Sequence, residues 1–307
     1  MKIERVLFIG SKSLGLECLK TLWEIKPEVL QGIVTINDEN DTRSVKKEIQ
    51  EFAREKGLPF YCGNSNKMLE KAIKETSPHL VIVVGWYTII PPHILYKVKA
   101  GFIGLHNSLL PKYRGGSPLI WAIINGEKKV GISLFYITEE MDAGDILGQK
   151  SIMVEKGDYI SDILSKLKEK AVELMHEVYP LLLEGKAPRI PQDHTQATYC
   201  AQRYPFDGEI NWQWSNSKIY NFIRAQSDPY PGAFTFWQER KLYVWKALPL
   251  EVTIYGTPGQ IAWVKEDGVY VVCGNNKPLI LQEVQWEGGL KAPANRILNS
   301  IKIRLGK

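Results

Sequence analysis

The first feature of this sequence that could do chemistry is a histidine at the end of a short apolar run. Phe102 to Leu105 is apolar, which is typical of a buried strand, and His106 falls where that strand should end. Pro111 and Gly115 then interrupt regular structure. Ligands of open α/β sheets bind at the carboxyl ends of the strands. A lone histidine is more often structural, so its role depends on the groups beside it.

A carboxylate that could partner this histidine is Asp142, in the polar turn 139–145. A turn that contains Gly144 can fold the carboxylate back beside His106, where it would orient the imidazole and stabilise its charged form. The alternative is an Asx turn that caps the next strand. The spacing alone leaves both interpretations open.

The residues around this pair resemble the folate-dependent formyltransferases. The motifs that carry the resemblance are His106-Asn-Ser-Leu-Leu-Pro-Lys-Tyr-Arg-Gly115, Pro118-Leu119, Asn125-Gly126-Glu127, Val130-Gly131-Ile132 and Met141-Asp142-Ala143-Gly144. The resemblance covers roughly the whole chain and is densest between residues 78 and 150. It implies an N-formyltransferase whose formyl donor is N10-formyltetrahydrofolate. In that family an Asn, a His and an Asp carry the chemistry, and His106 and Asp142 match the last two.

The family's Asn has no direct match, because the family pattern Asn-x-His reads Gly104-Leu105-His106 in this chain. Residues two apart on a strand face the same side, whereas neighbours face opposite sides. Asn107 therefore replaces the missing residue only if the backbone turns at His106. Otherwise a backbone N–H or a water stabilises the oxyanion, or the activity is weak or altered. Loss of one oxyanion donor typically costs ~10²–10³ in rate.

The surrounding elements predict an α/β fold, with a Rossmann-like open sheet followed by a small OB-like β-barrel. We expect a catalytic domain over 1–185, a linker over 186–205 and the barrel over 206–307. The first domain should hold strands at 6–9, 32–36, 58–61, 80–84, 102–105, 131–137 and 147–154, with helices at 16–22, 44–56, 67–76, 117–125 and 159–183. In the barrel we expect a helix capped by Ser215 and strands at 233–237, 242–247, 260–264, 269–273 and 279–284.

The loop after the strand Leu80–Val84 and the turn beside Asp142 are the expected cofactor site. The resemblance implies that this loop binds the folate through backbone groups and apolar contacts; ordinary core packing is the alternative for the apolar residues. The candidate cofactor residues are Trp86, Tyr87, Thr88, Ile89, Ile90, Glu140 and Met141.

The expected substrate site combines the turn after the first strand with one arginine. A Gly/Ser turn at a helix start offers backbone donors and the positive end of the helix dipole to a phosphate. The guanidinium of Arg114 could pair with phosphate oxygens, or equally with a structural carboxylate. The candidate substrate residues are Gly10, Ser11, Lys12, Ser13 and Arg114.

The loop 37–42 bears most directly on the acceptor. The resembling tRNA formyltransferases carry a basic, Gly-rich insertion here, whereas this chain has Asp38, Glu39 and Asp41. Phosphate contacts need Lys and Arg, so these carboxylates should repel tRNA. The run Asp228-Pro-Tyr-Pro-Gly232 also looks most like the sugar-nucleotide members. We therefore expect a nucleotide-linked amino sugar as acceptor, with tRNA disfavoured.

Other functions stay open on the sequence. They are methionyl-tRNA formylation, a non-catalytic folate- or nucleotide-binding homologue, and a hydrolase in which water replaces the amine. Trp237, Tyr243 and Trp245 alternate with Lys and Arg, a pattern that suits either a nucleic-acid-binding barrel or a barrel core.

Composition adds few constraints. The net charge of +5 suits an anionic substrate but is far from a nucleic-acid-binding signature. The four cysteines are scattered without metal-ligand spacing, so we expect no metal and a cytoplasmic protein. We expect no signal peptide and no membrane span. A homodimer is compatible with the sequence.

Overall fold

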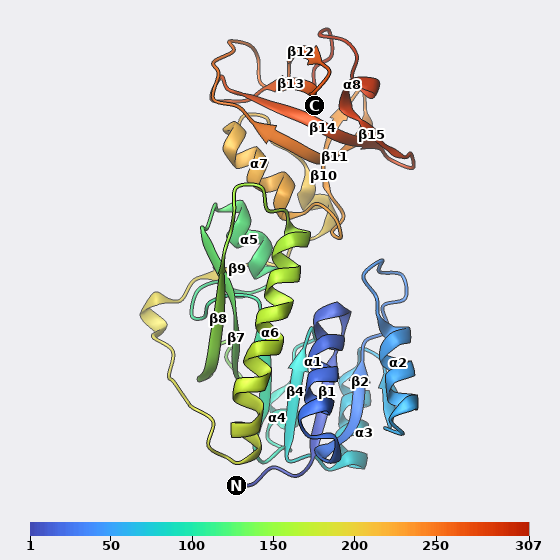
Figure 1. The fold of residues 1–307 in the computed structure, drawn as a ribbon, viewed down its shortest axis with the longest axis vertical. Coiled ribbons are helices and arrows are strands. Elements are labelled where there is room, and N and C mark those ends of the chain that lie inside the picture. The colour runs from blue at the N-terminus through green and yellow to red at the C-terminus, as the bar shows by residue number, and fades with distance from the viewer. Residues whose placement is uncertain (307) are drawn as a thin grey trace. The chain divides into compact units, whose positions relative to one another are not determined.

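A computed structural model describes residues 1–306 of the chain (Figure 1). The chain divides into two compact units. The first unit holds residues 1–118, 129–153 and 165–200, and the second holds residues 119–128, 154–164 and the chain from residue 201 onward. The first is an α/β unit and the second is rich in antiparallel strands, so the expected fold class is confirmed.

A seven-stranded sheet forms the first unit, in the order β3-β2-β1-β4-β5-β7-β8. Its strands are β1 (Val6–Gly10), β2 (Leu30–Thr35), β3 (Phe60–Cys62), β4 (Leu80–Val84), β5 (Phe102–His106), β7 (Lys129–Ile137) and β8 (Ile146–Met153). The first five are parallel, and β7 and β8 run antiparallel at one side. β1 and β4 are buried over their whole length, which explains their continuous apolar sequences.

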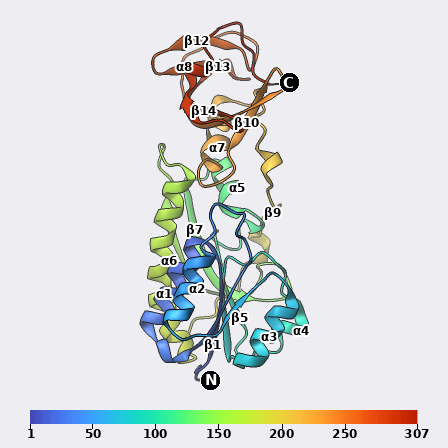
Figure 2. The same cartoon turned by 90° about the vertical axis from the view of Figure 1, so that its right-hand side faces the viewer.

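Helices cover both faces of this sheet. They are α1 (Lys12–Ile25), α2 (Lys46–Glu55), α3 (Asn66–Thr76), α4 (Pro92–Leu95) and most of α6 (Ile160–Leu183), with a 3₁₀ turn η1 (Pro27–Val29). The short helix α5 (Pro118–Ile124) belongs to the second unit apart from its first residue. Figure 2 shows α1 and α6 on one side and α3 and α4 on the other. Leu69 and Ile73 of α3 and Ile94 of α4 pack with the sheet residues Leu7 and Val81 in one core.

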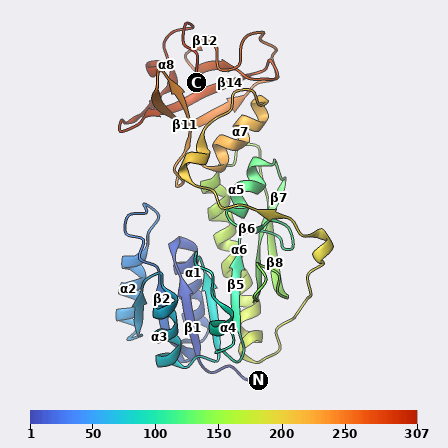
Figure 3. The same ribbon diagram turned by 180° about the vertical axis from the view of Figure 1, so that it is seen from behind.

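The second unit contains a six-stranded sheet, in the order β10-β11-β14-β13-β12 with β15 paired to β14. Its elements are α7 (Asn216–Ala225), β10 (Ala233–Trp237), β11 (Arg240–Pro249), β12 (Ile261–Lys265), β13 (Gly268–Val272), β14 (Pro278–Trp286), β15 (Lys291–Pro293) and α8 (Ala294–Ile297), preceded by η3 (Pro205–Gly208). Figure 3 labels β11, β12 and β14 of this sheet. Ser215 caps α7, because its side chain accepts the N–H of Lys218, as the sequence predicts.

Two differences from the sequence prediction lie near the site. α1 begins at Lys12, so the helix expected over 16–22 starts earlier and includes most of the turn expected after the first strand. The chain after α6 is not a plain linker, because it contains η2 (His194–Gln196) and the strand β9 (Tyr199–Cys200). β9 pairs in parallel with β6 (Arg114–Gly115), in the segment that follows His106. Among residues 1–306, none of the helices combines the length and the apolar character that a membrane crossing requires.

Candidate active site

His106 and Asp142 meet at the carboxyl edge of the sheet. His106 is the last residue of β5, and Asp142 lies in the turn between β7 and β8. The His106 Nδ1 atom lies 3.6 Å from the Asp142 Oδ2 atom, and the histidine side chain is only 11% exposed. The Nε2 atom lies 2.8 Å from the carbonyl oxygen of Tyr113. Because a carbonyl can only accept, Nε2 carries a proton and donates it, which turns Nδ1 toward the carboxylate.

The Asp142 carboxylate is held by a backbone donor. Its Oδ2 atom accepts the N–H of Gly115 at 2.8 Å. Asp142 has a φ of +50°, in the left-handed region that residues other than glycine seldom adopt. The turn thus folds the carboxylate back toward His106, in the arrangement that the sequence left as one of two options.

A buried serine fixes the loop that follows His106. Ser133 of β7 donates to the carbonyl of Ser108 (2.6 Å) and accepts the N–H of Leu110 (3.0 Å). Gln149 of β8 donates to the same hydroxyl at 2.7 Å. The hydroxyl is therefore fully paired. Our sequence reasoning missed Ser133, although a polar residue among the apolar residues of a strand was the available signal.

The position of the family's Asn is filled by aromatic packing. A Cβ atom on Gly104 would lie 2.8 Å from a ring carbon of Phe135 and 3.0 Å from Ile137 Cγ1. Phe135 is buried, and its ring centroid lies 6.2 Å from that of His106, edge to face. Asn107 is half-buried just beyond the end of β5. Its service as the oxyanion donor stays a prediction.

This packing predicts that Gly104 tolerates no side chain. Gly104→Ala should lower the free energy of unfolding by about 1–3 kcal/mol, because the methyl group overpacks the space against Phe135. Urea denaturation measures the loss. The double variant Gly104→Ala/Phe135→Leu should recover part of it. A Gly104→Ala protein of unchanged stability would contradict the packing seen here.

The loop after β4 presents apolar side chains at the same sheet edge. Tyr87 is 65% exposed and Ile89 is 80% exposed, while Ile90 is buried in the core. Trp86 is half-buried, and its Nε1 atom is buried with no hydrogen-bond partner within residues 1–306. Thr88 donates to the carbonyl of Asn64 at 3.4 Å. Ile90 is thus a core residue, whereas the other four line or approach the edge.

The two candidates beside Asp142 also point outward. Met141 is 55% exposed and the Glu140 side chain is 63% exposed. Both lie in the turn that carries Asp142. The Glu140 Oε1 atom lies 3.6 Å from the Arg114 Nη1 atom, so its carboxylate is ion-paired, whereas Met141 is exposed beside His106 and Asp142.

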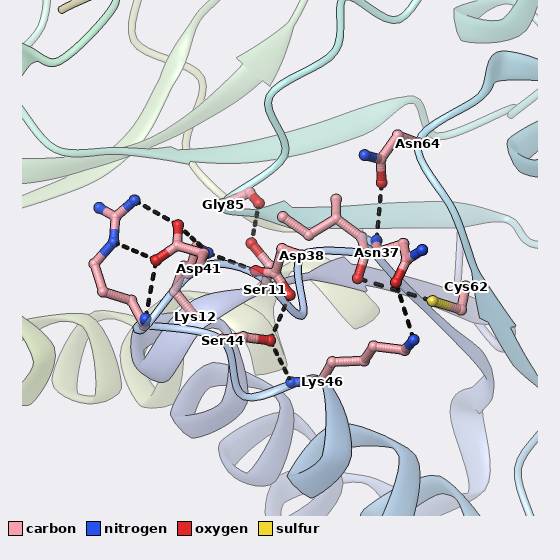
Figure 4. Close-up of polar contacts among 12 residues, drawn as sticks. Ser11, Lys12, Asn37, Asp38, Asp41, Ser44, Lys46, Cys62, Asn64 and Gly85 are labelled. Atoms are coloured by element: carbon pink, nitrogen blue, oxygen red, sulfur yellow. Dashed lines mark hydrogen bonds and ion pairs between the residues drawn. The ribbon is translucent and has the colours of Figure 1, made fainter. Parts of the chain in front are cut away.

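The turn after β1 is closed by an internal ion cluster (Figure 4). Gly10 ends β1, and Ser11 donates its hydroxyl to the carbonyl of Gly85 at 2.5 Å. The Lys12 ammonium lies 2.5 Å from Asp38 and 2.7 Å from Asp41, and its side chain is 14% exposed. Lys12 is thus occupied by carboxylates rather than left for a phosphate. Ser13 is exposed in the first turn of α1.

The same cluster removes the electrostatic argument against tRNA. Arg43 binds Asp41 (2.7 Å) and Lys46 binds Glu39 (2.9 Å). The hydrogen bonds from Arg43 and then Lys12 hold the pKa of Asp41 well below its usual range. Each acidic side chain of the loop therefore has a cationic partner. The expected repulsion of tRNA by this loop is therefore wrong. Composition shows the acidic residues of the loop but not the cations that pair with them.

Asp41→Asn should lower the free energy of unfolding at neutral pH by about 1 kcal/mol, since it removes charge-assisted hydrogen bonds. The folded state depresses the pKa of Asp41, so its stabilisation is complete above the ordinary aspartate range and is lost as the pH falls through the depressed value. The gap between wild type and variant should therefore narrow below about pH 4. Urea titrations at neutral and acidic pH measure it, with the exposed Glu51→Gln as control. A gap that stays constant with pH would contradict this.

Arg114 has a different place from the one expected. Its side chain is fully buried. The Nη2 and Nε atoms donate to Gln192 Oε1 at 2.8 and 3.3 Å, and Nη1 donates to the Tyr199 hydroxyl at 3.2 Å. A phosphate would have to displace these partners. Arg114 also lies 3.6 Å from the Glu140 carboxylate, so its contacts fit the structural alternative that the sequence left open and do not support the phosphate contact.

Comparisons with known proteins agree with the two-unit architecture. A family model described as formyl transferase matches residues 29–179, and one described as formyl transferase, C-terminal domain, matches residues 204–302. The methionyl-tRNA formyltransferase of Caldanaerobacter subterraneus subsp. tengcongensis is 35% identical over 294 residues, which cover 94% of both chains. That of Desulforamulus reducens is 30% identical over 308 residues, covering 98% of this chain and 96% of its own.

A solved structure shares the fold. HypX from Aquifex aeolicus in complex with tetrahydrofolic acid superposes with a TM-score of 0.68 at 19% identity, over 97% of this chain and 47% of that one. At this identity the likeness concerns the fold alone.

Proposed function

Because the chain belongs to the formyl transferase family, we propose that it transfers a formyl group from N10-formyltetrahydrofolate to the amine of methionyl-tRNA. The observation that carries the acceptor is the 35% identity to a methionyl-tRNA formyltransferase over 94% of both chains. The chain thus matches such an enzyme in both units and not in a shared motif alone.

The nucleotide-linked amino sugar expected from the sequence is wrong. Curated relatives that are 30–35% identical over nearly the whole chain are methionyl-tRNA formyltransferases. The loop 37–42 is acidic in sequence, but the structure pairs its carboxylates with Lys12, Arg43 and Lys46.

The loop after β4 carries side chains that would contact the folate. Tyr87 and Ile89 are exposed there and offer apolar contacts for a flat ring, and Met141 is exposed in the turn that carries Asp142. The Trp86 indole N–H is buried, so Trp86 would contribute through the packing of its ring, and Thr88 and Glu140 are the remaining candidates. These residues would hold the cofactor, whereas Ile90 supports the loop from the core.

His106 and Asp142 would supply the proton chemistry. When bound, N10-formyltetrahydrofolate supplies the formyl group in an activated amide. The attacking amine must lose a proton and the departing cofactor nitrogen must gain one. His106 Nδ1, the ring nitrogen that Tyr113 does not engage, would take up the first proton and return it to the departing nitrogen. Asp142 lies close enough to stabilise the imidazolium that results. The N–H of Gly115 keeps the carboxylate in place during this transfer.

The second unit carries a cluster of aromatic rings and cations. Trp237 stacks on Trp286, and the Arg240 guanidinium lies 4.2 Å above the Trp286 ring. Lys241 lies 4.5 Å above the ring of Phe234. Phe234 is buried, and the Trp286 ring is already stacked by Trp237 and Arg240, so these rings are packed against one another. What this cluster would offer to an RNA phosphate is the exposed Arg240 cation.

The test is an acceptor panel in which release of tetrahydrofolate is followed. We expect turnover with methionyl initiator tRNA and none with the same tRNA uncharged, with a nucleotide amino sugar or with no acceptor. Turnover with the amino sugar alone would overturn the proposed acceptor, and release without any acceptor would indicate a hydrolase.

A further inference from the structure

The chain that returns after α6 contributes one buried amide to the candidate active site. Gln192 is 6% exposed and lies between Arg114 and the turn that carries Asp142. Its Nε2 atom donates to the carbonyls of Asp142 (2.8 Å) and Gly144 (2.7 Å). Its Oε1 atom accepts from the Arg114 guanidinium at 2.8 and 3.3 Å. All hydrogen-bonding atoms of this amide are thus engaged within one network.

The two carbonyls that Gln192 binds belong to a turn in an unfavourable conformation. Asp142 has a φ of +50°, which a non-glycine residue keeps only where its surroundings fix it. The Asp142 side chain lies 3.6 Å from His106 Nδ1 and accepts the N–H of Gly115. Release of the carbonyls would let the turn relax and move the carboxylate away from the imidazole.

The Gln192 Oε1 atom also acts on the Asp142 carboxylate, through Arg114 and Gly115. Arg114 directly precedes Gly115 in β6, and its buried guanidinium depends on Gln192 for two of its hydrogen bonds. The network therefore holds Asp142 from its own turn and from the strand that donates to its carboxylate.

We propose that Gln192 is a positioning residue for formyl transfer: it holds the 142–144 turn so that the Asp142 carboxylate stays against His106. The segment between the two matched family regions is then part of the active site rather than a spacer. This inference rests on the proposed function, because its kinetic test uses methionyl-tRNA as the acceptor.

The decisive variant is Gln192→Glu. A glutamate keeps an acceptor for Arg114 but faces the carbonyls of Asp142 and Gly144 with oxygen instead of N–H, so it separates the two halves of the network. We expect kcat to fall about 10- to 100-fold, because small displacements of catalytic groups cost rate on this scale. The KM values for the cofactor and for methionyl-tRNA should change little.

Two further variants complete the kinetic test. Gln192→Met keeps a similar side-chain length but loses both hydrogen-bonding groups of the amide without adding a charge. It should show the same loss of kcat, and it replaces Gln192→Glu in the test if that protein does not fold. Asp193→Ala is the matched control, since Asp193 caps η2 through Thr195 and touches neither Asp142 nor His106. Wild-type kcat in a folded Gln192→Glu or Gln192→Met protein, or an equal loss in Asp193→Ala, would overturn the proposal.

A second readout does not depend on the acceptor. The imidazole nitrogen signals of His106, assigned by ¹⁵N NMR through His106→Ala, should shift in the folded Gln192 variant and stay unchanged in Asp193→Ala. Unchanged signals would overturn the positioning role even if the enzyme turned over. Lack of turnover by wild type with methionyl-tRNA would count against the proposed function only, and the NMR result would then decide the role of Gln192.

Discussion

His106→Ala is expected to lower kcat for formyl transfer by about 10³-fold, within the range typical of a lost general acid–base group. His106 ends β5 at the edge of the sheet. Its Nε2 atom contacts the Tyr113 carbonyl, and its Nδ1 atom faces the Asp142 carboxylate. Single-turnover measurements at saturating cofactor test the chemical step directly.

The variant should still bind the cofactor, because the proposed folate surface lies on the loop after β4 and not on the imidazole. A matched control is His176→Ala, which removes an exposed histidine on α6 and should leave kcat unchanged. Full activity in His106→Ala would remove His106 from the mechanism.

Asp142→Asn should lower kcat by about 10²–10⁴-fold while the protein keeps its fold. The amide has nearly the same shape, and its oxygen can still accept the N–H of Gly115. It carries no charge, however, so it cannot stabilise the imidazolium of His106 or fix the ring in its reactive state.

The matched control is Asp145→Asn in the same turn. The Asp145 carboxylate binds Arg189 at 3.1 Å and takes no part in the histidine pair. We expect the Asp145→Asn variant to retain nearly wild-type kcat. Equal losses in both variants would show that the turn needs any carboxylate for its structure, and would contradict a specific role for Asp142.

Local patterns predicted most of the fold well. The apolar run Leu80–Val84 is a strand of those bounds, and Ser215 caps α7 through its side chain. Such features depend on burial and capping within a few residues. The meeting of His106 with Asp142 was one of two options, and the geometry of the turn selects it.

The parts that sequence reasoning missed depend on contacts between distant segments. Lys12 lies between Asp38 and Asp41, so these carboxylates are not the unpaired charges that the sequence suggests. Gln192 lies beside Arg114, which the sequence predicts as a phosphate ligand. Both pairings span many residues, so no local period or spacing indicates them. The wrong choice of acceptor followed from treating the acidic loop as unpaired charge.

Methionyl-tRNA formylation is tested by identifying the amino acid released from methionyl-tRNA after incubation with the enzyme and N10-formyltetrahydrofolate. Mass spectrometry should find N-formylmethionine with the wild-type protein and unmodified methionine with His106→Ala. Unmodified methionine with the folded, folate-binding wild type would contradict the claim that this chain formylates methionyl-tRNA.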